Sequence, residues 1–231
     1  MTTQDLEPLE KRIRFSFSNT DFLRQALVHR SYLNENPDFP LGHNERLEFL
    51  GDAVLELVVT EYLYGKYDNP EGELTNWRAA LVNATMLSVV AGKIDLGDHI
   101  LLSRGEARDA SSKARQSILA NAVEALIGAI YLDKGYAAAK QFVEEFILSE
   151  LSTILEKKLY QDPKSQLQEE SQARLAVTPV YRVLEEHGPD HNKQFSVGVY
   201  LGDALLAEGK GSSKQEAQVA AAAAALEVKG W

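Results

Sequence analysis

The sequence contains no cysteine, which excludes disulfide bonds and thiolate metal sites. Any bound metal ion must therefore use oxygen or imidazole ligands, and the chain has only five histidines. The lack of cysteine fits a reducing compartment. The chain also lacks an apolar signal core near its start and any run of about 18 uncharged apolar residues. We therefore expect a cytoplasmic protein without a membrane anchor.

The chain also has fewer basic than acidic residues. The 34 acidic and 24 basic residues give a net charge of −10, which does not favour nucleic-acid binding through bulk charge and leaves only local patches for it. Simple solubility explains most of this acidity. The length of 231 residues and the hydrophobic content of 45% allow one large domain or two modest domains with a real core.

The first two thirds of the chain predict an all-α region. Amphipathic patterns are separated by turn residues, and no convincing strand alternation occurs before about residue 155. We expect helices over residues 20–33, 44–64, 72–94, 113–134 and 136–157.

The pattern changes after residue 160. A helix is expected to begin at Asp162-Pro163, with proline in its first turn, followed by short alternating stretches at 180–188, 193–201 and 204–211. The alanine-rich segment 212–229 is either low-complexity filler or a helix packed closely on a sheet, and the high helix propensity of alanine favours the helix. The predicted order is α-β-β-β-α, an antiparallel sheet covered on one face, with domains at 1–157 and 162–231.

The stretch NERLEFLGDAVLEL, which begins at Asn44, places several carboxylates on one predicted helix. Glu45, Glu48 and Asp52 share a face because a helix turns about 100° per residue. Like charges stacked in this way repel one another. On this pattern alone, a solvated polar stripe is the commoner explanation.

A second polar pair lies in SILANAVEALIGAIYLD, where Asn121 and Glu124 are three residues apart in an otherwise apolar helix. A buried carboxylate must be neutralised by a proton, a base or a metal, and no lysine or arginine occurs between Arg115 and Lys134. If the two helices pack together, their carboxylates would form an oxygen-lined site for Mg²⁺ or Mn²⁺. The residues alone leave both the metal site and the solvated stripe open.

These segments resemble a known family. HNERLEFLGDAVL, at residues 43–55, is similar to the signature of the ribonuclease III family, and ILANAVEALIGAIYLD resembles its second catalytic helix. EGELTNWRAALVN resembles the intermediate helix, and LSRGE resembles the loop that follows. The segments PKSQLQE, TPVYRVLEEHGPDHNKQFSVGV and GKGSSKQEAQVAAAAAAL resemble a double-stranded-RNA-binding domain. The similarity covers nearly the whole chain.

The resemblance implies a multidomain protein, with an all-α endonuclease domain followed by an α+β double-stranded-RNA-binding domain. It further implies a Mg²⁺-dependent homodimer, with Mn²⁺ as a substitute, that hydrolyses double-stranded RNA. The expected products carry 5′-phosphate and 3′-hydroxyl ends with short 3′ overhangs. Processing of ribosomal RNA precursors, mRNA and other structured RNA is the expected task.

By resemblance, the family's metal ligands match four positions: Glu48, Asp52, Asn121 and Glu124. Asp52 and Glu124 are the expected catalytic residues among them. The family normally has aspartate at position 121, so we expect weaker metal binding or a shifted metal preference.

Two further acids, Glu45 and Glu71, match supporting positions in the family's catalytic valley. Glu71 is equally well explained as an acid favoured by a helix N-terminus. Glu56 matches no functional position, and we expect it to be solvated. Phe49 is explained as a core aromatic and, as in the family, as a side chain that enters a pocket of the partner subunit; both hold if the core extends across a dimer interface.

The resemblance also assigns RNA contacts in the C-terminal domain. Ser165, Gln168 and Glu169 would meet one minor groove, His191 the next, and Lys214 the phosphates between them. His191 is also explained as a turn cap. Family members often carry more basic residues near position 214, and residues 160–231 hold 7 Lys and Arg against 10 Asp and Glu, a net charge of −3. We therefore expect a weak binding module that depends on avidity.

Two other functions compete with the endonuclease. One is a non-catalytic double-stranded-RNA-binding dimer, in which Asn121 marks decay of the catalytic site; the retained acids argue against it. The other is an unrelated all-α metal phosphohydrolase. It would need histidine ligands, and none of the five histidines pairs at ligand spacing with the helical acids.

Overall fold

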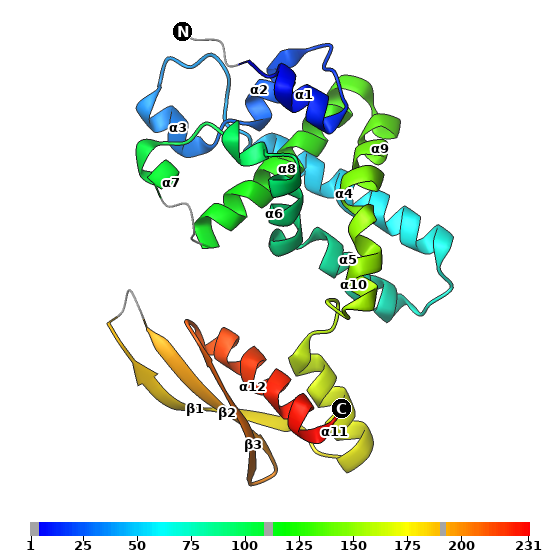
Figure 1. Cartoon of the computed structure of the whole chain (residues 1–231), viewed down its shortest axis with the longest axis vertical. Helices are drawn as coiled ribbons and strands as arrows, with labels where there is room; N and C mark the ends of the chain where they lie inside the picture. Colours follow the sequence, from blue (N-terminus) through cyan, green and yellow to red (C-terminus); the bar gives the residue numbers. More distant parts are fainter. Residues whose placement is uncertain (1–4, 109–112, 190–192) are drawn as a thin grey trace. The chain divides into compact units, whose positions relative to one another are not determined.

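The structure is a computed structural model that describes residues 5–108, 113–189 and 193–231. The chain divides into two compact units, Met1–Tyr160 and Gln161–Trp231 (Figure 1). No helix among the described residues is long and apolar enough to cross a membrane.

The first unit is helical. Apart from an isolated bridge between Val28 and Leu101, its described residues form no β-structure. Its α-helices are α1 (Glu7–Ile13), α2 (Thr20–Ala26), α3 (Arg30–Glu35), α4 (Glu45–Lys66), α5 (Glu71–Val82), α6 (Ala84–Lys93), α7 (Arg104–Arg108), α8 (Lys113–Lys134), α9 (Tyr136–Phe146) and α10 (Leu151–Glu156). Short 3₁₀ turns occupy Leu96–Asp98 and Leu148–Glu150.

Helices α4 and α8 form the centre of this unit and pack against each other more extensively than any other pair of its described helices (Figure 1). Their apolar faces carry fully buried residues such as Leu55 and Leu126. Two glycines let the backbones touch. A Cβ atom on Gly51 would lie 1.7 Å from the backbone oxygen of Glu124, and one on Gly128 would lie 2.3 Å from the backbone oxygen of Leu47. No larger residue fits at this crossing without moving a helix.

Three predicted helices are divided in the structure. The helix predicted over 20–33 breaks between α2 and α3, where His29 caps α3 by accepting a hydrogen bond from the backbone N–H of Ser31. The helix predicted over 72–94 breaks at Asn83, whose side chain accepts from the N–H of Met86 and donates to the carbonyl of Ala80. Each break has a side-chain cap that satisfies exposed backbone groups, which periodicity does not reveal.

The third divided helix was predicted over 136–157 and is interrupted by the 3₁₀ turn between α9 and α10. Helix α1 was not predicted, and α7 begins within LSRGE, which was predicted as a loop. Both helices are short, with 7 and 5 residues, so they contain too few turns for a clear helical period.

The second unit consists of α11 (Pro163–Leu175), β1 (Pro179–His187), β2 (Gln194–Leu201), β3 (Ala204–Gly211) and α12 (Lys214–Lys229). The strands form an antiparallel sheet in the order β1-β2-β3 (Figure 1). The predicted α-β-β-β-α order is confirmed.

The alanine-rich segment of this unit is a helix rather than filler. Ala221, Ala222 and Ala225 of α12 are fully buried against a core that includes Leu167 and Val199. On β3, a Cβ atom on Gly209 would lie 2.1 Å from the backbone nitrogen of Ala221. Small residues on both sides therefore let the helix lie directly on the sheet.

Candidate functional site

The crossing of α4 and α8 brings acidic residues from both helices together. Gly51 touches the backbone of Glu124, and Glu48 and Asp52 flank Gly51 on α4. Asn121 lies one turn before Glu124 on α8, and its amide donates a hydrogen bond to the carboxylate of Glu48. The structure therefore places four predicted site residues in one neighbourhood, although the two helices lie about 70 residues apart in sequence.

The carboxylates at this crossing repel one another. Partial burial, together with the negative charges of Asp52 and Glu48, raises the pKa of Glu124 to about 7. Burial also raises the pKa of Glu48, as do the charges of Glu45 and Asp52, whereas the hydrogen bond from Asn121 lowers it. At neutral pH the site therefore holds more negative charge than its surroundings neutralise.

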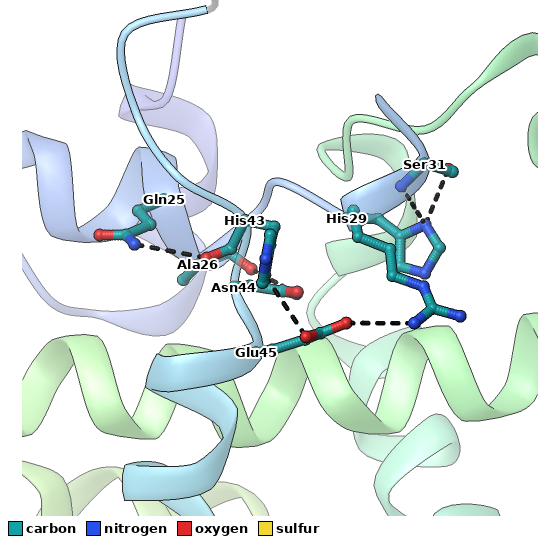
Figure 2. Close-up of polar contacts among 8 residues, drawn as sticks. Gln25, Ala26, His29, Ser31, His43, Asn44 and Glu45 are labelled. Carbon is teal, nitrogen blue, oxygen red and sulfur yellow. Dashed lines mark hydrogen bonds and ion pairs between the residues drawn. The ribbon is translucent and has the colours of Figure 1, made fainter. Parts of the chain in front are cut away.

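Glu45 is compensated differently, by basic neighbours. Its carboxylate lies 3.6 Å from Nη1 of Arg30 and 3.7 Å from Nδ1 of His43. Figure 2 shows His43 and Glu45 together at the start of α4, with His29 and Ser31 beside them. Glu45 remains coupled to Glu48 through its charge. It thus lies at the edge of the acidic group, between the group and two basic side chains.

Buried polar contacts hold the segment before α4 in place. Asn44 is buried, its backbone N–H donates to the carbonyl of Val28 at 2.9 Å, and its side chain donates to the carbonyl of Ala26 at 3.2 Å. Gln25 donates to the carbonyl of His43 (Figure 2). These bonds tie the start of α4 to the end of α2 and so position the first acidic turn.

The donor set suits a hard cation. Three carboxylates and one amide supply only oxygen ligands, which Mg²⁺ and Mn²⁺ prefer, and a divalent cation would relieve the repulsion that raises two of the pKa values. Within the described residues, no three His, Asp or Glu side chains stand in an arrangement that would hold a metal ion as they are oriented. The ligand roles therefore remain predictions.

Glu71 and Glu56 lie outside this group. Glu71 is exposed in the first turn of α5 and is not among the charges that raise the pKa of Glu48 or Glu124. Glu56 was expected to be solvated; its side chain is 38% exposed, and its carboxylate also forms an ion pair with Nε of Arg78 at 2.9 Å. Arg78 reaches Glu56 from α5, a tertiary contact that the helix pattern of α4 does not reveal.

Phe49 is not a core residue of the single chain, because 82% of it is exposed. On the same face of α4, Leu57 and Tyr64 are also exposed. Of the two readings of Phe49, the core aromatic is therefore wrong within one chain.

In the second unit, Ser165 and Gln168 line a surface groove together with Tyr181 of β1 and Gln215 of α12. The N–H and Oγ of Ser165 both donate to the carboxylate of Asp162, which caps α11. Glu169 is exposed on the same helix.

Lys214, the first residue of α12, forms an ion pair with Glu186 of β1 at 2.9 Å. The predicted contact residue His191 lies outside the described residues. Sequence reasoning missed Glu186, and it also missed Arg30, His43 and the two crossing glycines of the first unit. His43, Gly51, Gly128 and Glu186 lie inside the segments that resemble the family, and that position was their sequence signal.

Fold and site together define a class: a helical nuclease-type domain with an acidic centre, followed by a double-stranded-RNA-binding fold. Residues 19–151 match the family described as Ribonuclease-III-like, and residues 163–229 match the double-stranded RNA binding motif.

Named relatives cover almost the whole chain. The ribonuclease 3 of Borreliella burgdorferi is 43% identical over 94% of this chain and 88% of its own. That of Dehalococcoides mccartyi is 44% identical over 96% and 94%. The solved nuclease domain of ribonuclease III from Campylobacter jejuni is 42% identical, with a TM-score of 0.57 over 63% of this chain and 97% of that chain. The chain belongs to the ribonuclease III family and is an endoribonuclease that acts on double-stranded RNA.

Proposed function

We propose that this endoribonuclease depends on Mg²⁺, which Mn²⁺ can replace, and cleaves double-stranded RNA to 5′-phosphate and 3′-hydroxyl ends with short 3′ overhangs. The observation that carries the proposal is the meeting of Glu48, Asp52 and Glu124 at the crossing of α4 and α8, where burial and mutual repulsion raise the pKa of Glu124 to about 7. Such crowding is unfavourable for folding and is typical of a site that binds a cation or handles protons.

Each residue has a distinct proposed role. Glu48, Asp52, Asn121 and Glu124 would hold the cation, which supplies an acidified water and offsets charge on the scissile phosphate. Burial and the charges of Asp52 and Glu48 raise the pKa of Glu124 to about 7 without a cation, so a bound cation would displace the proton that this carboxyl partly holds at neutral pH. Asn121 orients the carboxylate of Glu48 through its hydrogen bond. Glu45 and Glu71 are proposed as supporting acids.

A cleavage assay on a long RNA duplex tests this function. We expect wild-type protein to cleave with millimolar Mg²⁺ and not in excess chelator, and Glu124→Gln to reduce cleavage on the order of a hundredfold or more, because a cation bound by these ligands supplies several kcal/mol of stabilisation. Glu56→Gln is the matched control, since it removes an acid from the same face of α4 outside the coupled group. Equal loss in both variants, or cleavage in chelator, contradicts the proposal.

We also propose a homodimer formed through α4. The exposed residues Phe49, Leu57 and Tyr64 are spaced by 8 and 7 residues and therefore lie within about 80° of one another along the helix. This apolar stripe is adjacent to the acidic face of the same helix, so a second copy placed on it would bring two acidic sites near each other. Two-fold symmetry of that kind matches the two strands of an RNA duplex.

The description of the solved Campylobacter jejuni nuclease domain mentions a region involved in dimer formation, which supports a dimer, and the exposed apolar stripe is what favours α4 as its interface. Sedimentation of Phe49→Asp should show a monomer where the wild type is a dimer. A dimer that survives this substitution contradicts the α4 interface. Cytoplasmic location and the processing of ribosomal precursors, mRNA and other structured RNA remain proposals that follow from family membership.

A further inference from the structure

Lys214 is held by the sheet of its own unit. Its Nζ atom lies 2.9 Å from Oε1 of Glu186 and 5.6 Å from the ring centre of Phe195. Glu186 on β1 and Phe195 on β2 are directly paired across the sheet. The ammonium therefore rests over the end of the β1-β2 pair, in contact with a carboxylate and an aromatic face.

The rest of the α12 N-terminus is also occupied. Ser213 accepts a hydrogen bond from the N–H of Glu216, and the Glu216 carboxylate accepts one from the N–H of Ser212 at 2.8 Å. This reciprocal pattern is a capping box, which satisfies two backbone donors at the start of the helix. Glu216, which stands where the family often has a basic residue, thus serves the helix and brings a negative charge. Lys214 is left as the basic side chain of this first turn.

Glu186 is charged at neutral pH. The hydrogen bond from Lys214 lowers its pKa most, and the nearby positive charge of Lys193 lowers it further. The Glu186 carboxylate would oppose a phosphate at Lys214 in two ways. It already binds the ammonium group, and its negative charge repels the phosphate. Exchange of one anion for another leaves the number of ion pairs unchanged, so binding gains little from this lysine.

We propose that Glu186 is an internal competitor for the phosphate site at Lys214 and thereby limits the affinity of this unit for double-stranded RNA. The inference rests on the double-stranded-RNA binding described above and adds a residue that sets its strength. Contacts between basic side chains and phosphates supply most of the affinity for nucleic acid. Because this unit has more acidic than basic residues, losing one such contact removes a large share of its affinity. Weak binding by one unit favours substrates that engage two copies at once.

The test measures binding of full-length chain to a fluorescent RNA duplex of about 20 base pairs, longer than the roughly 16 base pairs that such a domain spans. Chelator is present so that no cleavage occurs, and salt is varied from about 50 to 200 mM. Glu186→Gln keeps the shape of the side chain and removes its charge. Glu185→Gln is the matched control, because Glu185 is the neighbouring acid on β1, is exposed and pairs with His187.

We expect Glu186→Gln to bind the duplex roughly two- to fivefold more tightly than wild type, with a steeper salt dependence, and Glu185→Gln to bind as wild type does. Lys214→Gln should weaken binding only slightly, because Glu186 already occupies this lysine. Adding Glu186→Gln to Lys214→Gln should improve binding by less than Glu186→Gln does in the wild type, because only the repulsion of the phosphate is then removed. Thermal melts of the variants check that the fold is retained.

Three results would overturn the inference. If Glu186→Gln binds no more tightly than Glu185→Gln, Glu186 does not compete. If it binds more weakly than wild type, Glu186 orients Lys214 toward the phosphate instead. A wild-type protein that shows no preference for duplex over single-stranded RNA of the same length would overturn the proposed RNA binding itself, and the competitor role with it.

Discussion

The two units handle charge in opposite ways. At the crossing of α4 and α8, like charges are brought together in a partly buried place, and the partner from α8 that offsets the charge of Glu48 is a neutral amide, that of Asn121. In the second unit, opposite charges meet at the surface, as in the pair of Lys214 and Glu186. The first arrangement has unfavourable energy until a cation or proton arrives, whereas the second is already satisfied. The proposed catalytic site and the proposed RNA-binding surface therefore differ in how much of their charge is balanced in advance.

The largest effect should come from separating the two helices that create the acidic site. Gly51→Ala places a methyl group 1.7 Å from the backbone oxygen of Glu124, so we expect the first unit to lose about 3 kcal/mol of stability or more. Gly65→Ala is the matched control on the same helix, because a Cβ atom there meets nothing within 4 Å and alanine favours the helix. Urea unfolding followed by circular dichroism measures both. Similar stability of the two variants would mean that the helices do not touch at Gly51.

The next effect concerns pH. The folded-state pKa of Glu124 is raised from 4.5 to about 7, so the folded unit binds this proton more tightly than the unfolded chain. The carboxyl therefore carries no penalty below about pH 4.5, and a penalty grows as the pH rises from 4.5 to about 7. After allowance for solvent screening, we expect it to reach on the order of 2 kcal/mol.

Unfolding of wild type and Glu124→Gln at several pH values measures this penalty, because glutamine does not titrate. The advantage of the variant should appear between pH 5 and 7 and then stay constant. Adding Mg²⁺ at pH 7.5 should raise the melting temperature of wild type and have less effect on the variant. A constant difference between the two proteins at all pH values would show that Glu124 is not held among the other carboxylates.

A smaller effect is expected from changing the charge of the acidic group at position 121. Asn121→Asp replaces the amide that bonds Glu48 with a fourth carboxylate. We expect the Mg²⁺ concentration for half-maximal cleavage to fall, because the added charge strengthens cation binding, and stability without Mg²⁺ to decrease. Titration of cleavage against Mg²⁺ measures the first effect. Asn121→Ala separates loss of the hydrogen bond from gain of charge, and an unchanged Mg²⁺ requirement in Asn121→Asp contradicts the expected metal contact.

The smallest effect should come from the exposed pair at the edge of the acidic group. Arg30→Gln removes the guanidinium 3.6 Å from Glu45, and a pair this exposed contributes less than about 1 kcal/mol. Stability should therefore change little in urea unfolding at ordinary salt. A loss as large as that expected for Gly51→Ala would show that Glu45 belongs to the buried group rather than to its edge.

Sequence reasoning worked best where one local pattern was strong. The apolar period of α8 predicted its bounds, 113–134, and the three alternating stretches predicted the strands of the second unit. Sequence reasoning failed where a side chain caps the end of a helix or forms an ion pair with another element. The cap of α3 by His29, the cap of α6 by Asn83 and the pairing of Glu56 with Arg78 all depend on contacts that a helical period does not contain.

The amino-acid order alone was enough to establish the fold class, the family resemblance and the set of acids proposed for catalysis, because helix period, strand alternation and residue type are local properties of the chain. Tertiary packing settled which of those acids share one electrostatic environment. Gly51 and Gly128 let two backbones touch, and that contact puts Glu124 beside Glu48 and Asp52 while Glu71 stays apart. Folding likewise paired Lys214 with Glu186, since charge interactions depend on distances in space that separation along the chain does not determine.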